Sequence, residues 1–119
     1  MDPSPSQEST LAKYVSFFSY SGHAVKGMID HPSDRTGAAK VLVESLGGTL
    51  EAFYWMQGQH DGLLISELPD SVNGAALSAA VAASGAISRV ETHQLFDHDQ
   101  QASIVELARK ALGAYTPPD

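Results

Sequence analysis

The sequence predicts an α+β fold in which helices cover one face of a four-stranded antiparallel sheet. Apolar residues recur either at every second position, as in strands, or at spacings of three and four, as in helices. These runs follow the order strand, helix, strand, strand, helix, strand, helix. Glycine, proline or a helix-capping side chain stands at most of the breaks between runs, so each element has defined ends.

Residues 12–19 are rich in aromatic and β-branched side chains, which favours a first strand. Ser21 is placed to cap a short helical turn over residues 23–29. A helix resumes after Pro32, which suits a first helical position, and stops at Gly47-Gly48. Apolar residues at three- and four-residue spacing give this helix one apolar face: Ala38, Ala39, Leu42, Val43 and Leu46.

Residues 49–57 and 63–68 form the second and third strands, which a five-residue turn joins into a hairpin. A proline followed by a capping signal at Pro69-Asp70-Ser71 starts another helix, which runs to Gly85. Residues 87–96 form the fourth strand.

Residues 97–99 cap a last helix, whose apolar face is Ile104, Leu107, Ala108, Ala111 and Tyr115. The order βαββαβ with a C-terminal helix is the ferredoxin-like arrangement. Right-handed crossovers then give a four-stranded antiparallel sheet with helices on one face.

The chain of 119 residues fits one domain, which we expect over residues 11–115. Residues 1–10 are rich in Pro, Ser and Gln without periodicity, which predicts a disordered lead. Residues 116–119 are expected to form a disordered tail.

Fourteen acidic and seven basic residues give a net charge of −7, which argues against a nucleic-acid partner and against anionic membranes. The absence of cysteine excludes disulfides and thiolate metal sites. The first residues do not resemble a signal peptide, and residues 75–86 are too short for a spanning helix, so we expect a cytoplasmic protein. The sequence lacks the common nucleophile, phosphate-loop, dinucleotide and zinc-protease motifs, so we predict no cofactor and leave enzymatic activity open.

The second and fourth strands carry apolar side chains on both alternating faces. Strict alternation in the second strand puts Leu50, Ala52, Tyr54 and Met56 on one face and Thr49, Glu51, Phe53, Trp55 and Gln57 on the other. One aromatic or apolar pair, either Phe53 with Trp55 or Tyr54 with Met56, would therefore face away from the helices. Such a patch marks an interface, so we predict at least a dimer that pairs through this sheet face.

Topology places the end of the first strand, the hairpin tip and the start of the fourth strand at one edge of the sheet. His23, His60 and Asp61 are therefore candidates for a shared polar site, with Tyr54 or Trp55 as an apolar wall. Such a site could bind a small ligand, perform acid–base chemistry or hold a divalent metal. The simplest interpretation is that these residues are solvated surface groups, and the metal is the least favoured alternative.

His93 alternates with Arg89 and Glu91 on one face of the fourth strand, which favours a hydrogen-bond network at a sheet interface over catalysis. Lys26 and Arg35 are each interpreted as a partner in an ion pair rather than as a group that binds an oxyanion.

Several short motifs occur in a fixed order along the chain. They are Lys13-Tyr14-Val15, Val25-Lys26, Pro32-x-x-Arg35, Leu46-Gly47-Gly48, Phe53-Tyr54-Trp55 and Gly58-x-His60-Asp61. Together they resemble the GYD family over about residues 13–112. His60 stands where the family's Gly-x-Tyr-Asp signature has tyrosine, and Gly62 stands where a β-branched residue is usual. The resemblance implies a ferredoxin-like domain that pairs sheet to sheet as a dimeric α/β barrel, with no agreed activity.

The leading hypothesis is a small domain of unassigned activity that forms a homodimer or a higher homo-oligomer and binds a small molecule. The candidate ligand-binding residues are His23, Tyr54, Trp55, His60, Asp61 and His93. One alternative is an enzyme on the dimeric α/β barrel scaffold, isomerase-like or monooxygenase-like, with three of these histidines in acid–base roles. The other is a purely structural assembly protein.

Overall fold

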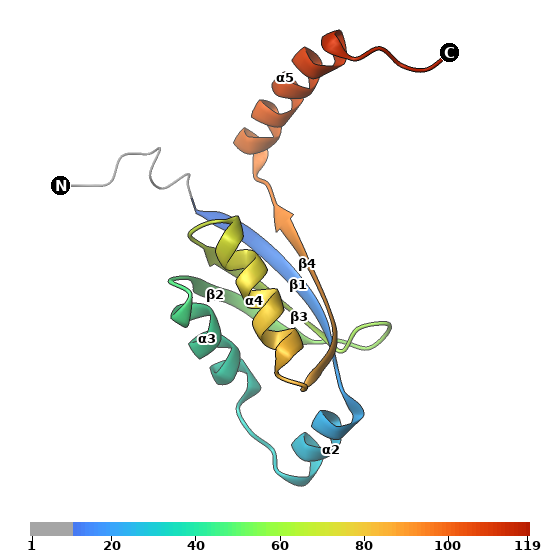
Figure 1. The fold of residues 1–119 in the computed structure, drawn as a ribbon. Coiled ribbons are helices and arrows are strands. Elements are labelled where there is room, and N and C mark those ends of the chain that lie inside the picture. The colour runs from blue at the N-terminus through green and yellow to red at the C-terminus, as the bar shows by residue number, and fades with distance from the viewer. Residues whose placement is uncertain (1–10) are drawn as a thin grey trace, which may run out of the picture.

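The computed structural model describes residues 11–119 and contains one antiparallel sheet with the strand order β2-β3-β1-β4 (Figure 1). The strands are β1 (Ala12–Tyr20), β2 (Thr49–Trp55), β3 (Gly62–Leu68) and β4 (Ile87–Leu95). This arrangement confirms the predicted ferredoxin-like α+β fold. The predicted disordered lead, residues 1–10, lies outside the described residues.

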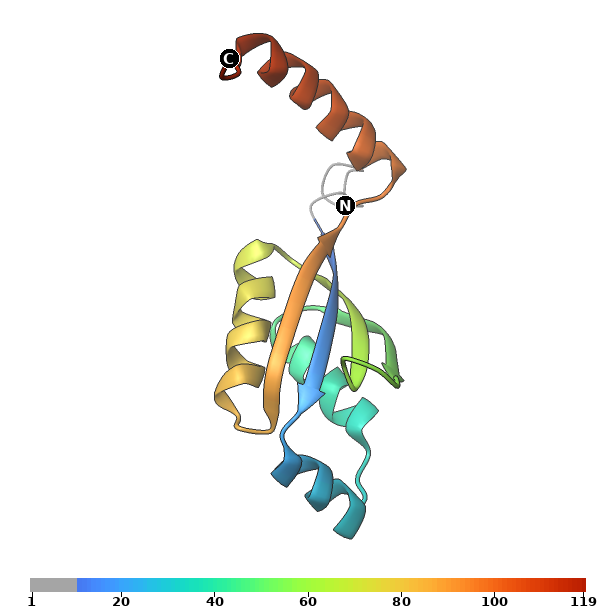
Figure 2. The same ribbon diagram turned by 90° about the vertical axis from the view of Figure 1, so that its right-hand side faces the viewer.

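Two helices, α3 (Arg35–Ser45) and α4 (Ser71–Ala83), lie side by side on one face of the sheet (Figures 1 and 2). The other two, α2 (Gly22–Asp30) and α5 (His98–Ala114), project beyond opposite ends of the sheet in both views. The expectation that helices pack on one face therefore holds for α3 and α4 alone.

Each of these four helices begins at a side chain that accepts a hydrogen bond from a backbone N–H of the first turn, as N-caps do. The caps are Ser21, Asp34, Asp70 and Asp97, with donor–acceptor distances of 3.1, 2.9, 3.0 and 2.8 Å. The start of α3 differs from the sequence prediction, because Asp34 rather than Pro32 sets its first residue.

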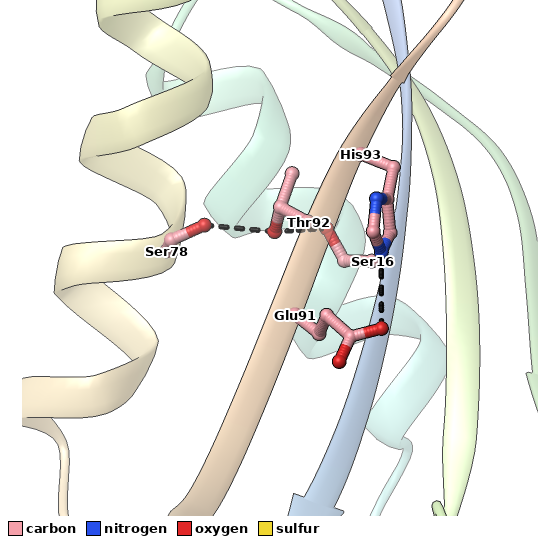
Figure 3. Close-up of polar contacts among 5 residues, drawn as sticks. All are labelled: Ser16, Ser78, Glu91, Thr92 and His93. Carbon is pink, nitrogen blue, oxygen red and sulfur yellow. Dashed lines mark hydrogen bonds and ion pairs between the residues drawn. The ribbon is translucent and has the colours of Figure 1, made fainter.

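The core lies between the sheet and helices α3 and α4. Its buried apolar residues are Ala12, Tyr14, Phe18, Val43, Leu64, Leu68 and Leu77. Hydrogen bonds between hydroxyl groups link α4 to the sheet (Figure 3). Thr92 Oγ1 lies 3.0 Å from the buried Ser16 Oγ and 2.8 Å from Ser78 Oγ on α4.

Three segments meet at one end of the sheet, as the topology predicts. The backbone N–H of Tyr20 donates to Asp61 Oδ2 over 2.9 Å, and the N–H of Asp61 donates to the carbonyl of Phe18 over 2.8 Å. The N–H of Ser21 donates to the carbonyl of Ala86 over 2.8 Å. The end of β1, the hairpin tip and the start of β4 are therefore held together.

Helix α5 contains no buried residue, and several apolar side chains of its predicted face are exposed, among them Ile104, Leu107 and Tyr115. The radius of gyration is 17.9 Å, whereas a compact domain of this length has a radius of gyration of about 13 Å. Within residues 11–119, every helix is too short or too polar to cross a membrane.

Replacing Gly48 with alanine should destabilise the fold, because the new Cβ would overlap the Glu67 carbonyl oxygen and lie 2.6 Å from Leu68 Cδ2. We expect the free energy of unfolding in urea to fall by about 1–3 kcal/mol. The matched control is Gly27→Ala, where no heavy atom lies within 4 Å of the added Cβ. It should leave stability unchanged or raise it by up to about 1 kcal/mol. Equal stability of the two variants would contradict this packing.

Candidate functional site

The sheet face opposite α3 and α4 is covered by none of the described helices (Figure 2). Residues paired directly across neighbouring strands point to the same face. The pairings Tyr54–Leu63–Phe17 and Ile65–Val15 therefore place five apolar side chains together on this face. We call the surface formed by Val15, Phe17, Tyr54, Leu63 and Ile65 the open face. Four of them are half-buried, and Tyr54 is 63% exposed.

A β-bulge in β2 decides which aromatic side chain points outward. The register with β3 shifts between Leu50 and Ala52, so Tyr54 joins the open face while Phe53 packs toward the core. Trp55 points to the helix side, where its ring lies 5.3 Å from that of Tyr20. The alternation expected for residues 52–55 is therefore confirmed, but the bulge puts Thr49 and Glu51 on the same face as Tyr54 rather than on that of Phe53 and Trp55. Tyr54 and Trp55 lie on opposite faces, as the alternation predicts, and of the two it is Tyr54 that shares the open face.

Two imidazoles lie next to Phe17 on the open face. The ring centroid of His60 lies 5.6 Å from that of Phe17, and the ring of His93 approaches Phe17 edge-on at 6.2 Å. Nδ1 of His60 is buried and forms no hydrogen bond within the part of the chain that the structure describes. A buried polar atom without a partner is costly unless another molecule satisfies it.

His93 also interacts with a carboxylate, as Figure 3 shows. Its Nε2 lies 3.0 Å from Oε2 of Glu91, and both side chains are exposed. The hydrogen bond from His93 is the main cause that lowers the pKa of the Glu91 carboxyl, and the nearby positive charges of His93, His60 and Arg89 lower it further. The predicted interaction of His93 with its neighbour on the same face is confirmed for Glu91.

The other end of the same sheet face carries a lysine between two carboxylates. Lys13 Nζ lies 3.2 Å from Glu51 and 3.8 Å from Glu67. The pKa of Glu67 is raised by its hydrogen bond with the Glu51 carboxyl and by partial burial, while the same hydrogen bond lowers the pKa of Glu51. The open face is thus apolar over β1, β2 and β3, and it is bordered by the polar side chains of β4 along one edge and by Lys13 with its two carboxylates at one end.

The six candidate residues do not form one site. Tyr54, His60 and His93 share the sheet face, whereas the carboxylate of Asp61 is engaged by the Tyr20 N–H and supports the fold. His23 is exposed on α2, which leads away from the sheet (Figure 1). Residues 11–119 contain no group of three or more His, Cys, Asp or Glu side chains that could hold a metal ion. The structure therefore does not support a metal bound jointly by His23, His60 and Asp61.

A second feature, which the sequence did not reveal, lies on the helix side. A cavity of about 260 Å³ lies between α3, α4 and the sheet, next to the packed core. Arg35 is one of the residues that line it. The expected ion pair of Lys26 is present with Asp30. The corresponding expectation for Arg35 is wrong, because no carboxylate within residues 11–119 forms an ion pair with it and its Nε is buried without a partner. In the sequence, the small residues of α3 and α4 were the only feature that could have indicated this cavity.

Comparison with known proteins adds a family. The family model described as "GYD domain" matches residues 14–105, most of the chain. A solved structure, that of an uncharacterized NIPSNAP-like domain protein from Burkholderia xenovorans, is 11% identical, with 92% of this chain and 90% of that chain covered and a TM-score of 0.46. No curated protein sequence matches the chain. On the strength of the family model, the chain belongs to the GYD family.

Proposed function

We propose that this protein is a homodimer that binds a small molecule on the open face, between the two copies. The observation that carries the proposal is the placement of His60 and His93 next to Phe17, on a sheet face that no described helix covers.

A second copy is the partner that best fits the open face. A sheet with helices on one side ordinarily presents polar residues on the other, and an exposed apolar patch marks an interface. The open face is instead aliphatic and aromatic at its centre. The large radius of gyration and the exposed apolar side chains of α5 also indicate a chain that reaches its compact form by association. A two-fold axis would bring the same face of each copy together, and the resemblance to the GYD family implies such sheet-to-sheet pairing.

The polar groups on the open face suit a small ligand at this interface. Binding pockets are mostly apolar, with a few placed polar groups that orient the ligand. An imidazole can donate one hydrogen bond and accept another. Nδ1 of His60 is buried without a partner among the described residues, so a ligand that lies against Phe17 could supply the missing hydrogen bond once the ring turns toward it.

The enzyme alternative rests on a specific observation, the contact between Glu91 and His93. A carboxylate that hydrogen-bonds an imidazole orients the ring and fixes its tautomer, which prepares it for acid–base work. His93 would then be the acid–base group, while His23, exposed on α2, has no part in this version. If the protein is instead a purely structural assembly, the interface between the two copies should be packed without room for a ligand.

Replacing Tyr54 with glutamate should dissociate the dimer, because it puts a charge into the centre of the proposed interface. We expect the dissociation constant to rise about tenfold or more, as measured by size-exclusion chromatography with light scattering over a dilution series. The matched control is Val72→Glu, since Val72 is 75% exposed on α4 and far from the open face in the fold. A monomeric wild-type protein at micromolar concentration, or equal effects of both variants, would contradict the dimer.

Native mass spectrometry of the protein as isolated should detect a dimer with an additional small mass bound. The double variant His60→Ala, His93→Ala should remain dimeric and lose that mass, since it removes the polar groups and keeps the apolar centre. His98→Ala is the control, because His98 is an exposed histidine at the start of α5. A dimer of bare mass in every sample would favour the structural assembly.

The Glu91 carboxyl should titrate below its ordinary pKa in NMR spectra of the wild-type protein, and His93→Ala should move that pKa upward. Because the folded-state pKa is lowered, the ionised carboxyl stabilises the fold above the ordinary glutamate pKa of about 4.3. That contribution is lost as the pH falls through the lowered folded-state pKa. An unchanged Glu91 titration in His93→Ala would show that this contact does not form, while His98→Ala should have no effect.

A further inference from the structure

We propose that the cavity between α3, α4 and the sheet binds a small monocarboxylic acid with an apolar body, and that Arg35 contacts its carboxylate. This site lies on the sheet face opposite the open face, so it does not rest on the proposed function. No family match or structural comparison assigns a ligand to it.

The cavity is predominantly apolar. Its floor is the sheet, where Phe18, Phe53 and Leu64 line it, and its roof is formed by the two helices. Ser16 lines it as well, but the hydroxyl of that residue is already within 3.0 Å of Thr92 Oγ1. The body of a ligand in this space would therefore meet mainly carbon atoms, which excludes a sugar or another strongly polar molecule.

The space exists because both helices present small side chains to it. Ala38 and Ala39 line it from α3, and Ala80 lines it from α4. Ala38 and Ala80 are exposed although they line the cavity, so it opens between the helices. An unfilled apolar cavity destabilises a fold in proportion to its volume. A volume of about 260 Å³ at an accessible position is therefore more simply explained as room for a ligand than as a packing fault.

Arg35 is the single charged residue among those that line this cavity. Its Nη1 lies 3.4 Å from the hydroxyl of Ser33, and its buried Nε has no partner within residues 11–119. The guanidinium group presents several N–H donors in a planar fork that matches a carboxylate. No acidic side chain lines the cavity to satisfy those donors from within the protein. A carboxylate on the ligand would supply the anionic partner that Arg35 lacks within residues 11–119.

The position of Arg35 also indicates the orientation of the ligand. Arg35 also lines an outer hollow, together with Asp34, Met28 of α2 and Trp55 of β2, and the Asp34 carboxylate accepts a hydrogen bond from the backbone N–H of Gly37. The guanidinium thus stands at the boundary between the apolar cavity and the region beside α2. A carboxylate held there remains near water, while the apolar body of the acid extends beneath α3 and α4.

Octanoate and 1-octanol are suitable probes, because they share an apolar chain and differ in charge. Calorimetric titration should show that the wild-type protein binds octanoate and that Arg35→Gln binds it about tenfold more weakly, since a hydrogen bond to a charged group is lost. Binding of 1-octanol should be the same in both proteins. Lys40→Gln is the matched control, because it removes a positive charge from the same helix outside the cavity lining.

A second experiment tests where octanoate binds on the protein. Octanoate should shift the NMR signals of Ala38, Ala80 and Ile87 and leave those of Phe17 and Tyr54 unchanged. Ala39→Phe should abolish binding of both probes by filling the cavity. If this variant does not fold, the comparison of Arg35→Gln with Lys40→Gln decides. Absence of octanoate binding, equal affinity of the wild type and Arg35→Gln, or shifts confined to the open face would each overturn the proposal.

Discussion

The four-stranded sheet carries apolar side chains on both faces, but the two helices that pack on it cover only one of them. The rest of the structure depends on this difference between the two faces. Helices α3 and α4 bury one face, on which the core residues converge. The other face remains aliphatic and aromatic without a helix to cover it. Removing apolar surface from water contributes roughly 25 cal/mol per Å², so covering the open face is favourable. The other features of the protein follow from which face a side chain occupies.

Strand β1 supplies both faces with neighbouring residues. Phe17 points to the open face between His60 and His93, while Phe18 lines the cavity under the helices. The period of two along a strand therefore gives this small domain two chemically different surfaces back to back. One is flanked by imidazoles and carboxylates, and the other contains a single guanidinium. The hydrogen bonds of Asp61 keep the hairpin tip, and with it His60, at the end of β1.

Local patterns determined much of the fold, and for that reason they were readable in the sequence. Capping residues such as Asp97, and the meeting of the hairpin tip with the end of β1, followed from side-chain chemistry and topology. Which of Tyr54 and Trp55 points away from the helices did not, because both alternating faces of β2 carry apolar side chains and a bulge interrupts the alternation between Leu50 and Ala52. The sequence also could not predict that Nε of Arg35 lacks a hydrogen-bond partner within residues 11–119, because this depends on which acceptors the tertiary fold brings near it. His60 belongs beside Phe17 through cross-strand register, which spacing along the chain does not report.

In the dimer that we propose, a second copy covers the open face. An isotope-filtered NOE experiment on a mixture of labelled and unlabelled wild-type chains tests this pairing most directly. We expect intermolecular NOEs between the side chains of Phe17, Tyr54 and Ile65 of one chain and those of the other. Intermolecular NOEs confined to the α3 and α4 side, or none at millimolar concentration, would contradict it.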